Sequence, residues 1–342
     1  MSTRPHHVRR RIVALALALL ACAAGVVAAG ALLGRHDGGR DAVAAAGPLV
    51  STVDGHGLPP IPPQGVNGPV LPTGPLPTSL AVNLAAPDRI RTPFHVMPRA
   101  GLVFDLDTGE VLWRRNPTRV LPMASVTKMM TALLVDERLP PGSLVRVTKQ
   151  AVRTGGSKVG VLPLGKRVGV QAMLYGLLLP SGNDAAVALA QRVSGTTKAF
   201  VALMNARAAA MHLSCTRFAS PSGLVDAGNH TCAYDLAALA KAFLDRPRLA
   251  GIVVRKQAIL PFPIKGGKLY LYSHEPLVKV GYPGALGIKT GFTDAAGHCV
   301  VGAAERGGHR LGVVLLHSPD ITAQSVKLLD RAFAYERKRD RR

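Results

Sequence analysis

Acidic side chains are scarce in this chain of 342 residues, which has 20 aspartates and glutamates against 42 lysines and arginines. The resulting formal net charge of +22 makes nucleic acid an obvious partner to consider. However, aromatic residues make up only 4% of the chain, the basic residues are scattered, and no nucleic-acid-binding motif appears. We therefore expect no nucleic-acid partner, and we attribute the charge to attraction toward anionic polymers or lipid headgroups.

Metal-binding patterns are absent as well, and cysteines are few. The histidines show no ligand spacing, so the sequence predicts no metal site and no cofactor. Four cysteines are too few for a disulfide framework. Cys299 lies in an apolar, strand-like run, which predicts a buried free thiol.

Long hydrophobic runs are lacking except for Ile12 to Leu33, which carries no charge and is long enough to span a bilayer. The basic residues within 1–11 predict a cytoplasmic N-terminus, with the remaining chain outside the cytoplasm. A cleaved signal peptide is the alternative for 12–33. We favour a retained anchor, because the apolar run is long for a signal segment.

The remaining chain divides by composition. Residues 34–95 are rich in proline and glycine and have no sustained period, which predicts an extended linker that buries no core. Residues 96–336 are long enough for one large domain, and residues 337–342 form a basic tail. In an oxidising compartment Cys215 and Cys232 could form a disulfide or remain as two thiols.

Three short strings bring together residue types that chemistry can use. They are Ser-Val-Thr-Lys at 125–128, Ser-Gly-Asn at 181–183 and Lys-Thr-Gly at 289–291. A serine hydroxyl is a poor nucleophile at neutral pH and needs a base beside it. On a helix predicted over residues 124–136, Lys128 shares a face with Ser125. Dry packing from Met129, Met130 and Leu133 would lower the pKa of Lys128 and let it act as that base.

The other two strings have weaker local signals. Ser181 to Asn183 falls in a turn between helices predicted over 170–179 and 184–193, where Gly and Asn are common anyway. The third string ends a strand-like run, Ala285 to Ile288. Apolar runs at 299–304 and 311–316, separated by Gly-rich turns, predict antiparallel strands, and the amphipathic segment 322–335 predicts a helix packed on their sheet.

A strand carrying Lys-Thr-Gly could accept a peptide by adding it to the sheet edge. Gly291 would let the peptide backbone approach closely, because glycine has no Cβ. Lys289 and Thr290 would grip a terminal carboxylate by charge and hydroxyl. The alternative is an ordinary strand end with a surface lysine.

The order of the three strings resembles the serine D-alanyl-D-alanine carboxypeptidases, the low-molecular-weight penicillin-binding proteins. Further similar segments, within about Pro98 to Arg337, are Ala100 to Glu110, Leu121 to Ala124, Gly156 to Gly160, Pro180 to Ala186, Pro221 to Leu224 and Ala233 to Leu236. The resemblance implies an α/β fold like that of β-lactamases and DD-peptidases. In that fold an antiparallel β-sheet is flanked by helices and accompanied by a helical lobe.

The resemblance also implies roles. Ser125 would be the acylated nucleophile and Lys128 its base, with Ser181, Asn183 and Lys289 completing the proton and charge relay. Thr290 and Gly291 would line the substrate strand, and the backbone N–H groups of Ser125 and Phe292 would form the oxyanion hole. The implied substrate is a peptidoglycan stem peptide, and β-lactam antibiotics would be covalent inhibitors. The expected location is outside the cytoplasm, anchored in the membrane by the N-terminal segment or secreted to the cell wall.

Rival interpretations share the same three strings. A class A β-lactamase needs an extra glutamate after the second string, yet no glutamate occurs between Glu137 and Glu275. A DD-endopeptidase on the same scaffold and a catalytically inactive wall-binding homologue remain alternatives. The missing glutamate favours a cell-wall carboxypeptidase over a resistance enzyme.

Overall fold

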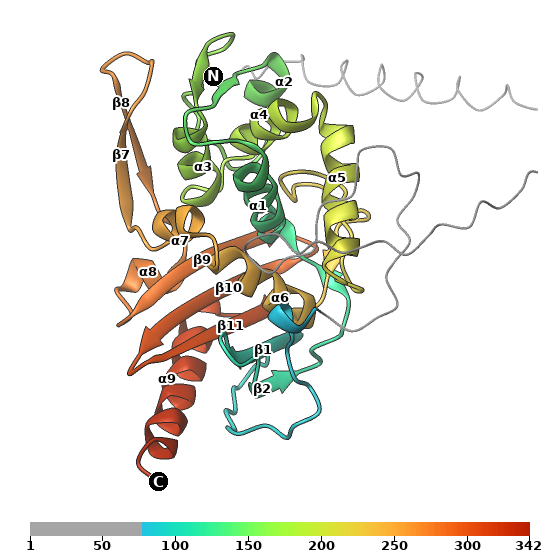
Figure 1. The fold of residues 1–342 in the computed structure, drawn as a ribbon, viewed down its shortest axis with the longest axis vertical. Helices are drawn as coiled ribbons and strands as arrows, with labels where there is room; N and C mark the ends of the chain where they lie inside the picture. Colours follow the sequence, from blue (N-terminus) through green and yellow to red (C-terminus); the bar gives the residue numbers. More distant parts are fainter. Residues whose placement is uncertain (1–76) are drawn as a thin grey trace, which may run out of the picture. The chain divides into compact units, whose positions relative to one another are not determined.

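The structure, a computed structural model, describes residues 77–342, and a five-stranded antiparallel sheet lies at the centre of this part (Figure 1). From edge to edge the strands are β2 (Val111–Arg115), β1 (Ala100–Asp105), β11 (His309–Ser318), β10 (Gly297–Arg306) and β9 (Ala285–Thr293). The strand β9, which contains the Lys-Thr-Gly string, is therefore an edge strand of the sheet.

Helices cover both faces of this sheet. The helix α9 (Ile321–Arg339) packs on one face, and α6 (Ala233–Leu244) packs on the other. Along β10, Val301 and Ala303 belong to the larger apolar core, whereas Val300 and Ala304 belong to the core beneath α9. The middle strands are thus buried on both faces, which explains why they are continuous apolar runs in the sequence.

A helical lobe accompanies the sheet and confirms the predicted fold class. It contains α1 (Lys128–Arg138), preceded by the 3-10 turn η2 (Ala124–Thr127), and α2 (Lys149–Arg153), α3 (Val170–Leu178), α4 (Asn183–Ser194) and α5 (Thr197–Ala210). The helices α7 (Pro247–Val253) and α8 (Pro276–Val280) connect it to the sheet. Three small two-stranded sheets are formed by β3 (Leu121–Pro122) with β6 (His230–Thr231), β4 (Leu144–Arg146) with β5 (Arg167–Gly169), and β7 (Gln257–Pro261) with β8 (Lys268–Tyr272).

Residues 77–95 pack onto the domain, so the prediction that 34–95 bury no core is wrong for this last part. After the 3-10 turn η1 (Thr78–Leu80), the side chains of Leu80, Val82 and Ile90 are 1%, 5% and 8% exposed. Three isolated apolar residues have no period, and composition alone therefore could not reveal them. The predictions for 1–11, 12–33 and 34–76 lie outside the described residues.

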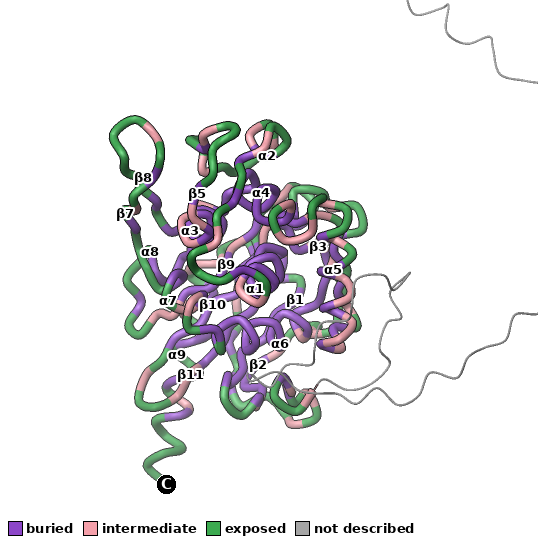
Figure 2. Tube along the Cα trace, turned by 45° about the horizontal axis from the view of Figure 1, so that its top comes forward, coloured by how far each residue is buried: buried purple, intermediate pink, exposed green. Residues whose placement is uncertain are grey.

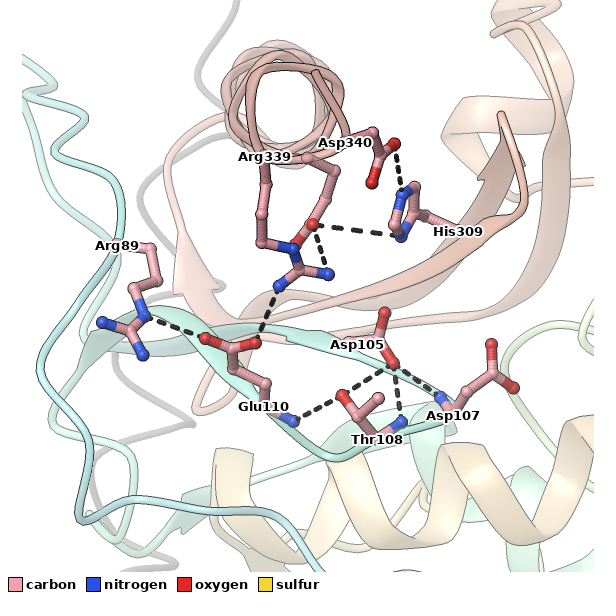
Figure 3. A network of polar contacts seen from close by, with 9 residues as sticks. Arg89, Asp105, Asp107, Thr108, Glu110, His309, Arg339 and Asp340 are labelled. Atoms are coloured by element: carbon pink, nitrogen blue, oxygen red, sulfur yellow. Dashed lines mark hydrogen bonds and ion pairs between the residues drawn. The ribbon is translucent and has the colours of Figure 1, made fainter. Parts of the chain in front are cut away.

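The carboxylate of Glu110 connects both ends of the described chain (Figure 3). Its Oε1 accepts a hydrogen bond from Arg89 at 2.8 Å, and its Oε2 lies 3.0 Å from the guanidinium of Arg339. Arg339 also contacts Glu336 at 2.7 Å. The predicted basic tail therefore begins too early, because α9 continues to Arg339. The last turn of α9 is held by Glu110, which lies just before β2 and also binds Arg89 in the segment before β1.

A disulfide joins Cys215 to Cys232, with Cα atoms 5.6 Å apart, so the open choice between a bond and two thiols is settled as a bond. The buried carboxylate of Asp235 beside it accepts hydrogen bonds from the Cys215 N–H and the Thr216 hydroxyl. These are the only described residues grouped closely enough to hold a metal ion, and bonded sulfurs do not act as thiolate ligands. Cys299 is a buried free thiol, as predicted.

Among residues 77–342, no helix combines the length and the apolar character that crossing a bilayer requires. The uncharged run Ile12 to Leu33 lies outside the described residues.

Candidate active site

The turn that carries Ser125 places its hydroxyl against an amine. Ser125 is the second residue of η2, and Lys128 is the first residue of α1. The Lys128 Nζ lies 2.7 Å from the Ser125 Oγ, as the three-residue spacing predicts. The preceding Ala124 has a φ of +48°, a left-handed conformation that costs energy for a residue with a side chain. The predicted helix thus exists, but it starts as a strained 3-10 turn at the serine.

Two distant segments pack closely against this turn, and each does so at a glycine. A Cβ at Gly223 would lie 1.9 Å from the carbonyl oxygen of Ala124. A Cβ at Gly291 would lie 2.9 Å from the backbone nitrogen of Ser125. Neither position leaves room for a side chain. The structure therefore gives Gly291 a different reason from the predicted approach of a substrate backbone: β9 itself packs against the serine turn.

The Lys128 amine is shielded from solvent and has three hydrogen-bond acceptors around it. Besides Ser125, its Nζ donates to the Asn183 Oδ1 and to the Ser222 carbonyl oxygen, each at 2.7 Å. Its side chain is fully buried, and the next residue in the chain, Met129, belongs to the main apolar core. Burial, followed by the positive charge of Lys289, lowers the pKa of Lys128 well below its ordinary value. A neutral amine at this position can accept the proton of the serine hydroxyl.

The second string lies at the start of α4 and contributes two side chains. Asn183 accepts from Lys128 through Oδ1 and donates from Nδ2 to the Gly155 carbonyl oxygen at 2.9 Å. Ser181 is 5% exposed, has a φ of +63°, and its Oγ has no hydrogen-bond partner among the described residues. A buried hydroxyl without a partner is costly, so packing alone does not explain this serine.

Asp184 extends this arrangement to the loop before α3. Its carboxylate accepts hydrogen bonds from the backbone N–H groups of Val159 and Gly160 at 2.9 and 3.1 Å. The backbone N–H of Asn183 donates to the Ser157 carbonyl oxygen at 2.7 Å. The start of α4 thereby fixes the 155–160 loop, which holds the Asn183 amide in turn.

The third string lies inside β9 and not at a strand end, because β9 continues to Thr293. Lys289 is 1% exposed, and its Nζ donates to the Thr290 carbonyl oxygen at 2.9 Å. Burial lowers the pKa of Lys289 to about 7, and the negative charge of Glu275 opposes that decrease. Thr290 is half-buried, whereas Phe292 is exposed and its ring centroid lies 4.5 Å from that of His298.

Sequence reasoning missed two groups at this site. The Ser222 carbonyl has no side-chain signature, although the surrounding Pro221 to Leu224 segment was noted for its resemblance. Glu275 is 4% exposed and caps α8 by accepting from the Val278 N–H at 2.8 Å, and burial raises its pKa to about 7. The sequence offered one signal for Glu275, because it is the first glutamate after a long stretch that contains none.

Comparisons with known proteins identify a family whose model matches most of the described chain. A model of the D-alanyl-D-alanine carboxypeptidase family matches residues 88–320. The chain is 35% identical over 244 residues to D-alanyl-D-alanine carboxypeptidase DacF of Bacillus subtilis, covering 69% of this chain and 62% of that relative. It is 36% identical over 241 residues to D-alanyl-D-alanine carboxypeptidase DacB2 of Mycobacterium tuberculosis, covering 68% and 81%.

A solved structure has the same fold. The crystal structure of a D-alanyl-D-alanine carboxypeptidase from Mycobacterium tuberculosis superposes with a TM-score of 0.66 at 34% identity. The match covers 71% of this chain and 94% of that chain. The part of the sequence that resembles known proteins is thus the part that carries the sheet, the helical lobe and all three strings.

Proposed function

Because the chain belongs to the D-alanyl-D-alanine carboxypeptidase family, we propose that it removes the terminal D-Ala from peptidoglycan stem peptides through an acyl-enzyme on Ser125. The observation that carries the proposal is the 2.7 Å contact between the Ser125 Oγ and the buried Lys128 Nζ. An amine that has been desolvated in this way can take the hydroxyl proton at neutral pH.

The proposed reaction has two halves. In the first, Lys128 accepts the Ser125 proton while Oγ attacks the carbonyl carbon of the penultimate D-Ala. The backbone N–H groups of Ser125 and Phe292 stabilise the oxyanion. Ser181, whose Oγ is otherwise without a partner, passes the proton to the leaving D-Ala amine. In the second half, water hydrolyses the ester and releases the trimmed peptide, and the proton returns to Ser125.

Substrate binding uses the edge of the sheet. The stem peptide lies along β9 as an added strand, with its terminal carboxylate held by the Lys289 ammonium and the Thr290 hydroxyl. Asn183 both fixes Lys128 and contacts a substrate amide. Gly291 keeps β9 close to the serine turn, which brings the bound peptide to the nucleophile. Phe292 supplies an exposed apolar side chain at the same edge.

The setting follows from the substrate. Peptidoglycan lies outside the cytoplasm, so we propose an extracytoplasmic enzyme that the N-terminal segment attaches to the membrane or directs to secretion. Neither a cofactor nor a metal ion is needed for the proposed steps, and no nucleic acid takes part. β-Lactams would acylate Ser125 and leave slowly, because the chain offers no glutamate between 137 and 275 to activate water.

Mass spectrometry of the full chain after incubation with penicillin tests the nucleophile. We expect one long-lived adduct that peptide mapping places on Ser125, and none in Ser125→Ala. Labelling at another residue, or full labelling of the Ser125→Ala variant, would contradict the assignment.

Turnover separates the alternatives. A model pentapeptide ending in D-Ala-D-Ala should lose one D-Ala, whereas a crosslinked dimer should be cut more slowly. Fast, repeated hydrolysis of penicillin would support a β-lactamase, preferred cleavage of the crosslink would support an endopeptidase, and an inert chain would support a wall-binding homologue.

A further inference from the structure

The hairpin formed by β7 and β8 projects from the body of the domain beside α3 (Figure 1). Its strands pair from Gln257 with Tyr272 to Pro261 with Lys268. Side chains alternate between the two faces along each strand. The inward pair Ala258 and Leu271 is 9% and 3% exposed and belongs to the main core. The hairpin is therefore fixed to the domain by one face only.

Much of the hairpin is exposed to solvent (Figure 2), and its outward face carries apolar side chains. Ile259 is 55% exposed, and its direct cross-strand partner Tyr270 is also 55% exposed. Tyr272, two residues along the same strand, is 59% exposed. Single exposed apolar residues are common on soluble proteins, but three that adjoin on one face of a projecting element form a patch.

Cations flank the strands that carry this patch, and the same stretch of sequence contains no acid. Arg255, Lys256, Lys265 and Lys268 are all exposed, and none forms an ion pair with another described residue. No aspartate or glutamate occurs between Asp245 and Glu275. The hairpin thus presents tyrosine and isoleucine side chains on strands flanked by four positive charges that pair with no described acid.

We propose that this outward face of the β7–β8 hairpin docks on an anionic lipid bilayer. Tyrosine suits the boundary between headgroups and acyl chains, because its ring is apolar and its hydroxyl is polar. Lysine and arginine are attracted to anionic headgroups at the same depth. The surface shares no residue with the Ser125 site, so it does not depend on the proposed reaction.

Two other occupants fit less well. A soluble polyanion would satisfy the four cations, but it offers nothing to the exposed isoleucine and tyrosines. A second copy of the chain would bring two hairpins of the same sign together without any acid between them, which is unfavourable. Only an anionic bilayer complements both the charge and the apolar side chains.

Tryptophan fluorescence of the full chain on vesicles tests this docking. The reporter is Tyr270→Trp. The matched control is Leu144→Trp, at a position that is 52% exposed in the small two-stranded sheet of β4 and β5. The single native Trp113 is buried and gives a constant background. Vesicles contain phosphatidylcholine with brominated acyl chains, with or without phosphatidylglycerol.

With phosphatidylglycerol present, emission from Tyr270→Trp should shift to the blue and be quenched by the bromines, and added salt should reverse both. Leu144→Trp should stay unquenched. Adding Lys265→Glu and Lys268→Glu to the Tyr270→Trp chain should abolish its quenching while penicillin still labels Ser125, which shows that the fold is intact.

Three results would overturn the proposal. One is the absence of quenching at 270 beyond that at 144, and another is equal quenching at 270 without phosphatidylglycerol. The third is a blue shift that appears without vesicles and grows with protein concentration, which would identify a second copy as the occupant. Because penicillin labelling is scored separately, failure of docking is distinct from failure of the proposed function.

Discussion

Lys128 shows how much of this site depends on burial of a single amine. Removed from water and placed near a second ammonium, Lys128 has a pKa far below that of a surface lysine. Its three contacts are to a hydroxyl, an amide oxygen and a backbone carbonyl, and the negative charge of Asp184 only partly opposes the decrease in pKa. The same burial lowers the pKa of Lys289, where the negative charge of Glu275 opposes the decrease.

Replacing Lys128 by arginine should nearly abolish acylation, since a guanidinium stays protonated and cannot act as the base. Loss of a general base costs about 10² to 10⁴-fold in rate. The measurement is the rate of penicillin adduct formation by mass spectrometry. Lys241→Arg is the matched control, because that lysine is 6% exposed and lies outside the site. If Lys128→Arg is acylated at the wild-type rate, Lys128 is not the base and acts only as a structural cation.

Replacing Glu275 by glutamine should move the alkaline limb of kcat/KM to lower pH. The negative charge of Glu275 raises the pKa of Lys289, so its loss lets that pKa fall below about 7. The proton needed to bind the substrate carboxylate is then lost at lower pH. The pH profile with the model pentapeptide measures this, with the exposed Glu305→Gln as control. If the alkaline limb of Glu275→Gln stays at the wild-type pH, the Lys289 ammonium does not bind the substrate carboxylate.

At the scale of elements, the serine turn depends on β9 and on the loop before β6. We expect Gly223→Ala to destabilise the fold and to suppress acylation, since its Cβ would meet the Ala124 carbonyl oxygen at 1.9 Å. Gly228→Ala is a matched control, because its φ of +72° is nearly the same but its Cβ would meet only ordinary contact at 3.8 Å.

Both alanines carry the left-handed penalty of about 1–2 kcal/mol. Thermal unfolding should therefore show a decrease for both variants, and the acylation rate should fall only for Gly223→Ala. Equal acylation by the two variants would mean that the loop adapts and does not hold the serine turn.

The sequence was most informative where contacts are local. The three-residue spacing predicted the contact of Ser125 with Lys128, because one helical turn sets that distance. The Ser222 carbonyl could not be predicted, since every residue has one and only the tertiary fold selects it. Lys289 was predicted at a strand end because the apolar run stops at Ile288, yet pairing with β10 extends β9 to Thr293.

For the whole molecule, the main error of sequence reasoning concerned where the domain begins. A proline-rich stretch has no period, yet Leu80, Val82 and Ile90 are buried individually as this stretch crosses the domain. The disulfide between Cys215 and Cys232 was left open for a related reason, because only the fold brings their Cα atoms to 5.6 Å. By contrast, the overall fold class was predicted correctly from the family resemblance that the three strings carry.

A chain that begins at Pro77 should be clearly more stable than one that begins at Val96. Starting at 96 removes the burial of three side chains, each worth about 1.5–3 kcal/mol as an upper estimate. It also removes the contact between Arg89 and Glu110. Urea unfolding followed by circular dichroism measures the difference in midpoint. Equal midpoints would show that residues 77–95 contribute nothing to the stability of the domain.

The position of Gly291 against the serine turn also has a consequence for the folding pathway. The proposed nucleophile, Ser125, comes earlier in the chain than Gly223 and Gly291, the two glycines that pack against its turn. A partly folded chain that lacks this C-terminal strand therefore has the serine but not its working geometry. If the proposed reaction needs this geometry, acylation begins only when both segments have docked, so the first penicillin adduct formed during refolding would time their docking on the serine turn.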